Sequence, residues 1–180
     1  DYVVSFGPQH PSTHGVLQLR VSLNGETVKH IDPNFGYIHR GIEKMCESYT
    51  YPKILHLCER LDYLSAAINR HGFCLCVEKA LELEVPERAV YVRTIFDELT
   101  RIASHLLGWA SMANDMGAIT AFIYGMRDRE KIMDIFEETA GGRLFTNYSV
   151  IGGLMQDIHP NFQKRVKEFI PYMRKMLKEY

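Results

Sequence analysis

The chain has 180 residues, of which 46% are hydrophobic and 11% aromatic, and its formal net charge is -1. This composition excludes a disordered chain, which would be poor in apolar residues and strongly charged. The nearly balanced charge argues against a nucleic-acid-binding protein, because it provides no long-range attraction to phosphate.

The first elements are predicted to be strands. Apolar and polar residues alternate from Leu17 to Leu23, which is the period of a half-buried strand. Asn24-Gly25 is a strong hairpin signal, and residues 26–31 then form the returning strand. Asp32-Pro33-Asn34 has the composition of a turn that ends this strand.

From about Gly41 the pattern becomes helical. Apolar residues recur at helical spacing after Pro52, which predicts one amphipathic helix that continues to about Leu83. A second helix is expected to begin at residues 85–87, with Pro86 in its first turn, and to end near Gly117.

A third helix is predicted from Ile119 to Thr139, ending at Gly141-Gly142, with residues 127–131 on its solvated face. Pro160 is expected to open a last helix, which Pro171 kinks or divides.

The predicted fold class is α+β, mainly α. A β hairpin or small sheet forms residues 1–40, and a bundle of long helices forms residues 41–180. We expect the helical part to be one domain from a longer chain, because the sequence starts without Met and its last helix is still amphipathic at Tyr180.

The cysteines and the hydropathy limit the kinds of site. No C-x-x-C pair occurs, so the four cysteines are expected to be small buried residues in a reducing compartment, with no zinc or iron–sulfur site: Cys46, Cys58, Cys74 and Cys76. No apolar run approaches the ~18 residues that a membrane-spanning helix needs.

The densest polar motif is the loop from Gly7 to Gly15, in which prolines and glycines flank His10 and His14. A metal site, a purely structural loop and a ligand-facing loop are the alternatives. A metal site would need a third ligand. Loops on a rigid scaffold often carry binding groups, which favours the ligand-facing alternative.

Three other motifs combine polar and apolar residues. Arg40 and Glu43 flank Gly41, and Glu43 suits the first turn of a helix. Tyr63 follows Arg60 on the helix predicted after Pro52, where a tyrosine usually belongs to the core. Asp115 lies at a predicted helix end, where the helix dipole disfavours an acid, so a cationic or donor partner is expected.

Taken in order, the motifs resemble one family closely, the D-type, quinone-site subunit of respiratory complex I (NADH:quinone oxidoreductase). The segments that carry the resemblance are FGPQHPSTHGVLQL, GYIHRGIEK, RLDYLSA, RTIFDELTRIASHLL, NDMGA and MRDRE. It covers essentially the whole chain and about the N-terminal half of the family. The resemblance implies the fold of the large subunit of nickel–iron hydrogenases. RLDYLSA stands where those enzymes have their first C-x-x-C motif, so no metal site is expected.

The resemblance also implies roles for individual residues. His14 resembles the ligand of the quinone headgroup, Tyr63 the tyrosine at its other end, and Asp115 the acid paired with that histidine. His10 would shape the loop, and Arg40 resembles the arginine near the terminal iron–sulfur cluster of a neighbouring subunit.

Leu107 and Ser111, two turns and one turn before Asp115, are expected to line the quinone pocket. Tyr63 and His14 would each donate a proton to the reduced quinone.

The implied protein is a peripheral subunit of a proton-pumping complex, on the cytoplasmic side of the cell inner membrane or the corresponding organelle face. Its substrate would be quinone. Its partners would be the B-type subunit, which holds a 4Fe–4S cluster, and the membrane-arm subunits, with no nucleic acid. Two alternatives remain at this point: a large subunit of a hydrogenase-related complex, and a scaffold subunit without a catalytic role.

Overall fold

A computed structural model describes residues 2–10 and 15–180, except for the side chain of His10. The chain divides into two compact units, residues 1–47 and residues 48–180.

The first unit is built on a three-stranded antiparallel sheet. Its strands are β1 (Tyr2–Phe6), β4 (Gln18–Asn24) and β5 (Thr27–Asn34), in the order β1-β4-β5. The predicted hairpin at Asn24-Gly25 is confirmed, and Gly25 has the positive φ of 59° that favours glycine in such a turn. The structure adds β1, which was not predicted from the alternating pattern.

The expected turn at residues 32–34 is wrong, because β5 continues to Asn34 through Pro33. A proline has no N–H to give to a neighbouring strand, and it is tolerated here because β5 is an edge strand. Helix α1 (Ile42–Ser48) follows, with Glu43 in its first turn as predicted.

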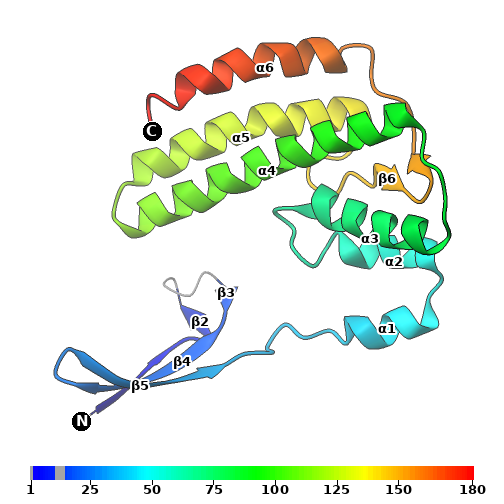
Figure 1. Cartoon of the computed structure of the whole chain (residues 1–180). Coiled ribbons are helices and arrows are strands. Elements are labelled where there is room, and N and C mark those ends of the chain that lie inside the picture. The colour runs from blue at the N-terminus through cyan, green and yellow to red at the C-terminus, as the bar shows by residue number, and fades with distance from the viewer. Residues whose placement is uncertain (1, 11–14) are drawn as a thin grey trace. The chain divides into compact units, whose positions relative to one another are not determined.

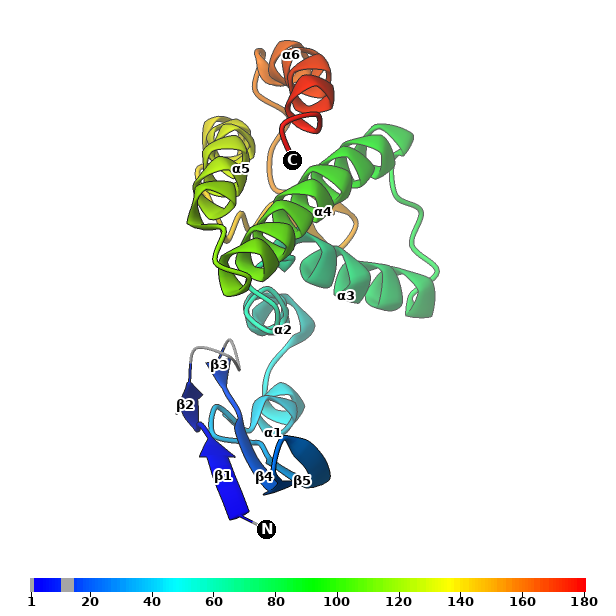
Figure 2. The same ribbon diagram turned by 90° about the vertical axis from the view of Figure 1, so that its left-hand side faces the viewer.

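The second unit is mainly helical (Figure 1). Its elements are α2 (Tyr51–Cys58), α3 (Ala66–Ala80), α4 (Glu87–Asp115), α5 (Ile119–Ala140), β6 (Ser149–Val150), β7 (Gly153–Leu154) and α6 (Phe162–Met176). In Figures 1 and 2, α5 runs beside α4, and α3 lies on the side of α4 away from α6. The α+β, mainly α fold class is thus confirmed.

The ends of α4 and α5 lie where the sequence predicts them. Pro86 precedes the first turn of α4. Gly117 and Gly141 follow the two helices with φ values of 89° and 79°, a conformation that stops a helix and favours glycine.

The prediction of one helix from Pro52 to about Leu83 is wrong. The chain leaves the helix after Cys58 and re-enters one at Ala66. Asp62 provides the alternative backbone pairing, because its carboxylate accepts a hydrogen bond from the Leu64 N–H at 3.1 Å and its carbonyl accepts one from the Asn69 amide at 3.1 Å. The apolar periodicity continues through this break, which is why it did not reveal the break.

The division of the last helix at Pro171 is not observed either. Helix α6 begins at Phe162, two residues after Pro160, and continues through Pro171 to Met176. Pro171 removes only one backbone hydrogen bond from the helix, and its ring lies on the exposed side.

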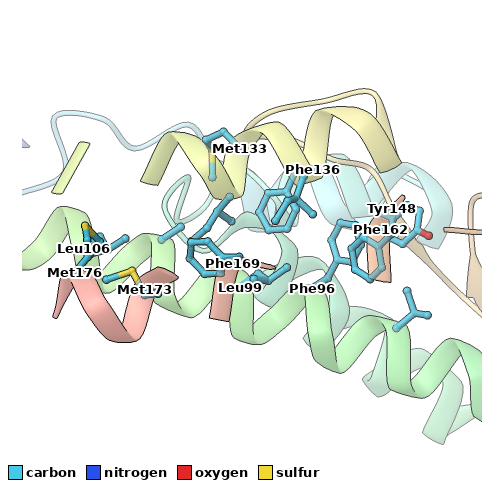
Figure 3. Close-up of a cluster of buried hydrophobic side chains, with 14 residues drawn as sticks. Phe96, Leu99, Leu106, Met133, Phe136, Tyr148, Phe162, Phe169, Met173 and Met176 are labelled. Atoms are coloured by element: carbon cyan, nitrogen blue, oxygen red, sulfur yellow. The ribbon is translucent and has the colours of Figure 1, made fainter. Parts of the chain in front are cut away.

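An apolar core fills the space between α4, α5 and α6 (Figure 3). At one end Phe96 of α4 stacks on three rings that come from different parts of the chain. The ring centroids of Tyr148, Phe136 and Phe162 lie 4.3, 5.0 and 5.5 Å from that of Phe96. These contacts fix α5, α6 and the segment before β6 against α4.

Two buried arginines attach the β6–β7 hairpin to the helices. Arg93 of α4, only 1% exposed, forms a two-bond pair with Glu78 of α3 at 2.7 and 3.0 Å. Arg70 of α3 donates to the carbonyl oxygen of Ser149 and lies 3.5 Å from the carboxylate of Glu59. Burial alone would raise the pKa of Glu78, but the hydrogen bonds from Arg93 and Gly152 outweigh it and hold that pKa below its usual value.

The expectation that residues 127–131 form a solvated face is wrong for Asp128. Asp128 is fully buried, and its carboxylate accepts hydrogen bonds from Arg127 at 2.7 Å and from the hydroxyls of Tyr172 and Tyr180 on the α6 side. Burial raises the pKa of Asp128, but these hydrogen bonds outweigh it and lower the pKa below its ordinary value. Asp128 therefore fastens α5 to the last segment of the chain.

This network makes a prediction about acid stability. A lowered pKa in the folded state means that the unfolded chain takes up the proton first as the pH falls. The stabilisation from Asp128 is therefore present at neutral pH and is lost below about pH 4, the ordinary range of an aspartate. Asp128→Asn should lower the free energy of unfolding at neutral pH by about 3 kcal/mol, by leaving buried donors poorly paired.

Urea unfolding followed by the helical circular-dichroism signal tests this, with the exposed Asp134→Asn on the same helix as control. The difference between wild type and Asp128→Asn should shrink as the pH falls through the acid range. A difference that stays constant from neutral to acid pH would contradict the assignment.

The four cysteines differ in their burial. Only Cys74 is buried, whereas Cys46 and Cys58 are partly exposed and Cys76 is exposed, so the expectation of four buried cysteines is wrong. Within residues 2–10 and 15–180, no cluster of three or more His, Cys, Asp or Glu side chains could hold a metal ion. In the same part of the chain, no helix combines the length and hydropathy needed to cross a bilayer.

Candidate functional site

The predicted site residues come from both compact units. His10, His14 and Arg40 belong to the first unit, and Tyr63, Leu107, Ser111 and Asp115 belong to the second. His14 lies outside the described residues, and for His10 only the backbone is described. The pairing of His14 with Tyr63 and Asp115 therefore stays a prediction.

In the first unit, short strands flank the predicted ligand loop. Strand β2 (Gln9–His10) pairs antiparallel with β3 (Gly15–Val16), so the backbones of His10 and Gly15 lie opposite each other. Gly7, with φ of 94°, lies so close to the chain that a Cβ there would meet the Leu17 carbonyl oxygen at 2.1 Å. A side chain at position 7 would therefore force the two ends of the loop apart.

Arg40 lies in an exposed segment just before α1. Gly41 follows it with φ of 64°, and the Gly41 N–H donates to the imidazole of His39 at 3.3 Å. Arg40 is exposed, and no intramolecular hydrogen bond or ion pair of its side chain is seen among the described residues.

In the second unit, Tyr63 lies in the turns between α2 and α3 rather than on a helix. Its side chain is 59% exposed, so the expectation of a core tyrosine is wrong. The segment is nevertheless fixed at several points. The carboxylate of buried Glu59 accepts a hydrogen bond from the Asn147 N–H at 2.9 Å. The Arg60 guanidinium lies 4.7 Å from the centre of the Phe145 ring. The Asp62 carboxylate accepts a hydrogen bond from the Leu64 N–H. Tyr63 thus presents an accessible phenol on a well-anchored turn.

Leu107, Ser111 and Asp115 form a row along α4. Spacing of four residues places them on one face of the helix, and the row continues the turn that contains Thr100 and Ala103. Tyr63 lines a small cavity together with Thr100 and Ala103. The tyrosine therefore lies beside one end of this row, while Asp115, twelve residues beyond Ala103, lies about 18 Å further along the axis.

Asp115 is the last residue of α4, and exposed apolar residues precede and follow it in the sequence. The turn into α5 is closed by hydrogen bonds from Gly117 to the Asn114 carbonyl and from Ala118 to the Ala113 carbonyl, both 2.9 Å. Large apolar residues are exposed on both sides of this turn: Met112, Met116, Ile119 and Ile123. The apolar group was not predicted, although Met and Ile at residues 112–123 could have indicated it.

The phenol of Tyr63 and the carboxylate of Asp115 determine what chemistry these residues can perform. A phenol can donate both a hydrogen bond and a proton, and a carboxylate can hold a cation or a protonated imidazole beside it. The apolar side chains near Asp115 suit a flat, hydrophobic ligand more than a charged one. The cavity under Tyr63 is itself only about 10 Å³, so a ligand of several rings would lie on the exposed side of the tyrosine.

Comparison with known proteins gives the family. Residues 115–180 match the family described as the 49 Kd subunit of the respiratory-chain NADH dehydrogenase. The whole chain is 64% identical to part of the C/D-type subunit of the NADH-quinone oxidoreductase of Bacteroides thetaiotaomicron, covering 34% of that protein. It is 48% identical to the D-type subunit of Desulforamulus reducens and 44% identical to that of Bacillus mycoides, covering 49% of each.

The chain thus spans between a third and a half of the length of these relatives, and all of its residues align with them. The motifs and the matches agree, and over its whole length the chain is similar to D-type NADH-quinone oxidoreductase subunits.

Proposed function

We propose that this chain forms part of the quinone-reduction site of a proton-pumping NADH:quinone oxidoreductase, acting only within the assembled complex. The observation that carries the proposal is the exposed phenol of Tyr63 on an anchored turn, at one end of the α4 row that leads to Asp115. The names of the relatives, all NADH-quinone oxidoreductase subunits, support the substrate.

Reduction of a quinone consumes two electrons and two protons, one proton for each carbonyl oxygen. In the proposal the electrons come from a 4Fe–4S cluster held by the neighbouring B-type subunit, with exposed Arg40 facing that protein. Tyr63 donates its hydroxyl proton to one oxygen of the reduced headgroup, and His14 donates an imidazole proton to the other. His10 shapes the loop that carries His14, and Leu107 and Ser111 line the path of the ligand along α4.

Asp115 connects this chemistry to a change of charge. A carboxylate beside His14 stabilises the protonated imidazole, and the charge pair is broken when His14 gives up its proton. Loss of this charge pair would shift the conformational equilibrium of a nearby element that has two stable arrangements. That shift would couple quinone reduction to proton pumping by the membrane-arm subunits. In this proposal the chain is a peripheral subunit on the cytoplasmic side of the inner membrane.

The role of Asp115 can be tested by Asp115→Asn, which keeps the shape of the side chain but removes its charge. Quinone reduction by the intact complex should slow by about tenfold or more, because a positioned proton donor contributes roughly 10²–10⁴-fold and only part of its efficiency is lost. Glu98→Gln, on an exposed turn of the same helix, is the control and should leave the rate unchanged. Equal rates for Asp115→Asn and wild type would refute the role.

Photolabelling of the intact complex with a quinone analogue tests the proposal as a whole. The label should attach within residues 7–16 or beside Tyr63, and an excess of unlabelled quinone should prevent it. If this subunit is only a scaffold that covers its neighbour's cluster, the label will attach to other subunits and leave these two segments unmodified.

A further inference from the structure

Three buried polar atoms in the second unit have no hydrogen-bond partner among the described residues and belong to side chains around the same cavity. They are the hydroxyl oxygens of Thr100 on α4 and Thr146 before β6, and the Nε of Arg129 on α5. The two threonines are only 4% and 5% exposed. Thr94, on the same helix as Thr100, shows the usual solution for a helical threonine, since its hydroxyl donates to the Val90 carbonyl at 2.9 Å.

Leaving these atoms unpaired would be costly. A buried donor or acceptor without a partner loses the hydrogen bonds it would make to water, so three of them would cost a large share of the stability of an ordinary domain. Burial also lowers the pKa of Arg129, with Glu130 acting in the opposite direction. A ligand that pairs all three atoms at once would remove most of this cost.

The size of the cavity limits the ligand. Its volume is about 10 Å³. A buried water needs about 10–15 Å³ of such space and typically makes about three hydrogen bonds. A chloride ion or an organic molecule is larger than this space, whereas a water can accept a hydrogen bond from the Arg129 N–H and exchange hydrogen bonds with two hydroxyl groups.

We propose that one ordered water molecule binds between Thr100, Arg129 and Thr146. It accepts a hydrogen bond from the Arg129 Nε–H and is hydrogen-bonded to both threonine hydroxyls. It thereby connects α4, α5 and the segment before β6 at a point where these three elements have no direct polar contact through these atoms.

The water has a consequence for the proposed function. Tyr63 and Leu64 line the same cavity, so the water lies under the turn that carries the phenol. The water would hold this turn in place and so keep Tyr63 at a fixed distance from α4. This consequence rests on the proposed function, whereas the water site itself rests only on the three polar atoms and the cavity.

The test is a structure of the intact complex at a resolution at which other buried waters are visible. A density peak within hydrogen-bond distance of all three side chains is expected. The assignment is overturned if the cavity shows no peak, or if Arg129 turns to a partner and the threonines pair with protein atoms. Neither result depends on quinone chemistry, so the water site and the proposed function can fail separately.

Substitutions of Thr100 test whether its hydroxyl binds the water. Thr100→Val keeps the shape and removes the hydroxyl, so the peak should disappear or lose most of its height, whereas Thr100→Ser should retain it. Thr139→Val is the matched control, because the Thr139 hydroxyl is also buried and has no hydrogen-bond partner in the described part of the chain, but does not line this cavity. That variant should keep the full peak. An unchanged peak in Thr100→Val would contradict the proposed coordination.

Discussion

Tyr63→Phe is expected to slow quinone reduction by about 10²-fold or more, the contribution of a positioned proton donor. The substitution keeps the ring and removes only the hydroxyl. In the described residues this hydroxyl makes no hydrogen bond and the side chain is 59% exposed, so the fold should not change. Quinone reduction by the intact complex, measured with a short-chain quinone, gives the rate.

The control for this variant is Tyr91→Phe, because Tyr91 is a tyrosine of similar exposure on α4 that the proposal does not use. Its rate should equal that of wild type. In the proposal, electrons reach the iron–sulfur cluster of the neighbouring subunit before they reach quinone, so reduction of that cluster by NADH should be normal in both variants. Normal quinone turnover in Tyr63→Phe would exclude Tyr63 as the donor.

Arg93→Leu should lower the free energy of unfolding by about 3–5 kcal/mol, the cost of removing one partner from a buried ion pair. Arg93 forms two bonds to Glu78 and also donates to the carbonyl oxygens of Val150, at 2.6 Å, and Gly153, at 2.9 Å. Leucine would leave a buried carboxylate and two carbonyls without this donor. The β6–β7 hairpin should detach first.

Arg101→Leu is the matched control, because Arg101 lies on the same helix and pairs with Glu98 in an exposed position. Exposed pairs contribute about 0–1 kcal/mol, so this variant should be nearly as stable as wild type. Urea unfolding followed by the helical circular-dichroism signal compares the two. Equal losses would show that the buried pair has no special role in holding the hairpin.

A second variant separates the ion pair from the hairpin contacts. In Glu78→Gln the charge is lost, but the side-chain oxygen can still accept the Gly152 N–H, which now lies 2.7 Å from Glu78. Its destabilisation should therefore be smaller than that of Arg93→Leu. An equal loss in the two variants would mean that the bonds from Arg93 to the hairpin backbone add nothing to the charge pair and would contradict this expectation.

Local signals in the sequence predicted much of the fold. Asn24-Gly25, Pro86, Gly117 and Gly141 each act within a few residues, and each ends or begins an element where it was expected. The break at residues 59–65 was missed because its causes are distant. Glu59 is held by the backbone of Asn147, which lies 88 residues away in the chain.

The candidate site could be predicted only in part. The exposure of Tyr63 and the burial of Asp128 both depend on which helices pack together, and spacing along one helix does not contain that information. The roles of His14, Tyr63 and Asp115 came from the family resemblance and not from local chemistry. The cavity between Thr100, Arg129 and Thr146 was invisible in the sequence, since its residues come from three separate elements.

The most direct measurement is a structure of the intact complex with a short-chain quinone bound. The proposal predicts that the Tyr63 hydroxyl lies within hydrogen-bond distance of one carbonyl oxygen of the headgroup and the His14 imidazole within the same distance of the other. A headgroup bound elsewhere, or protein filling the space between Tyr63 and His14, would contradict it.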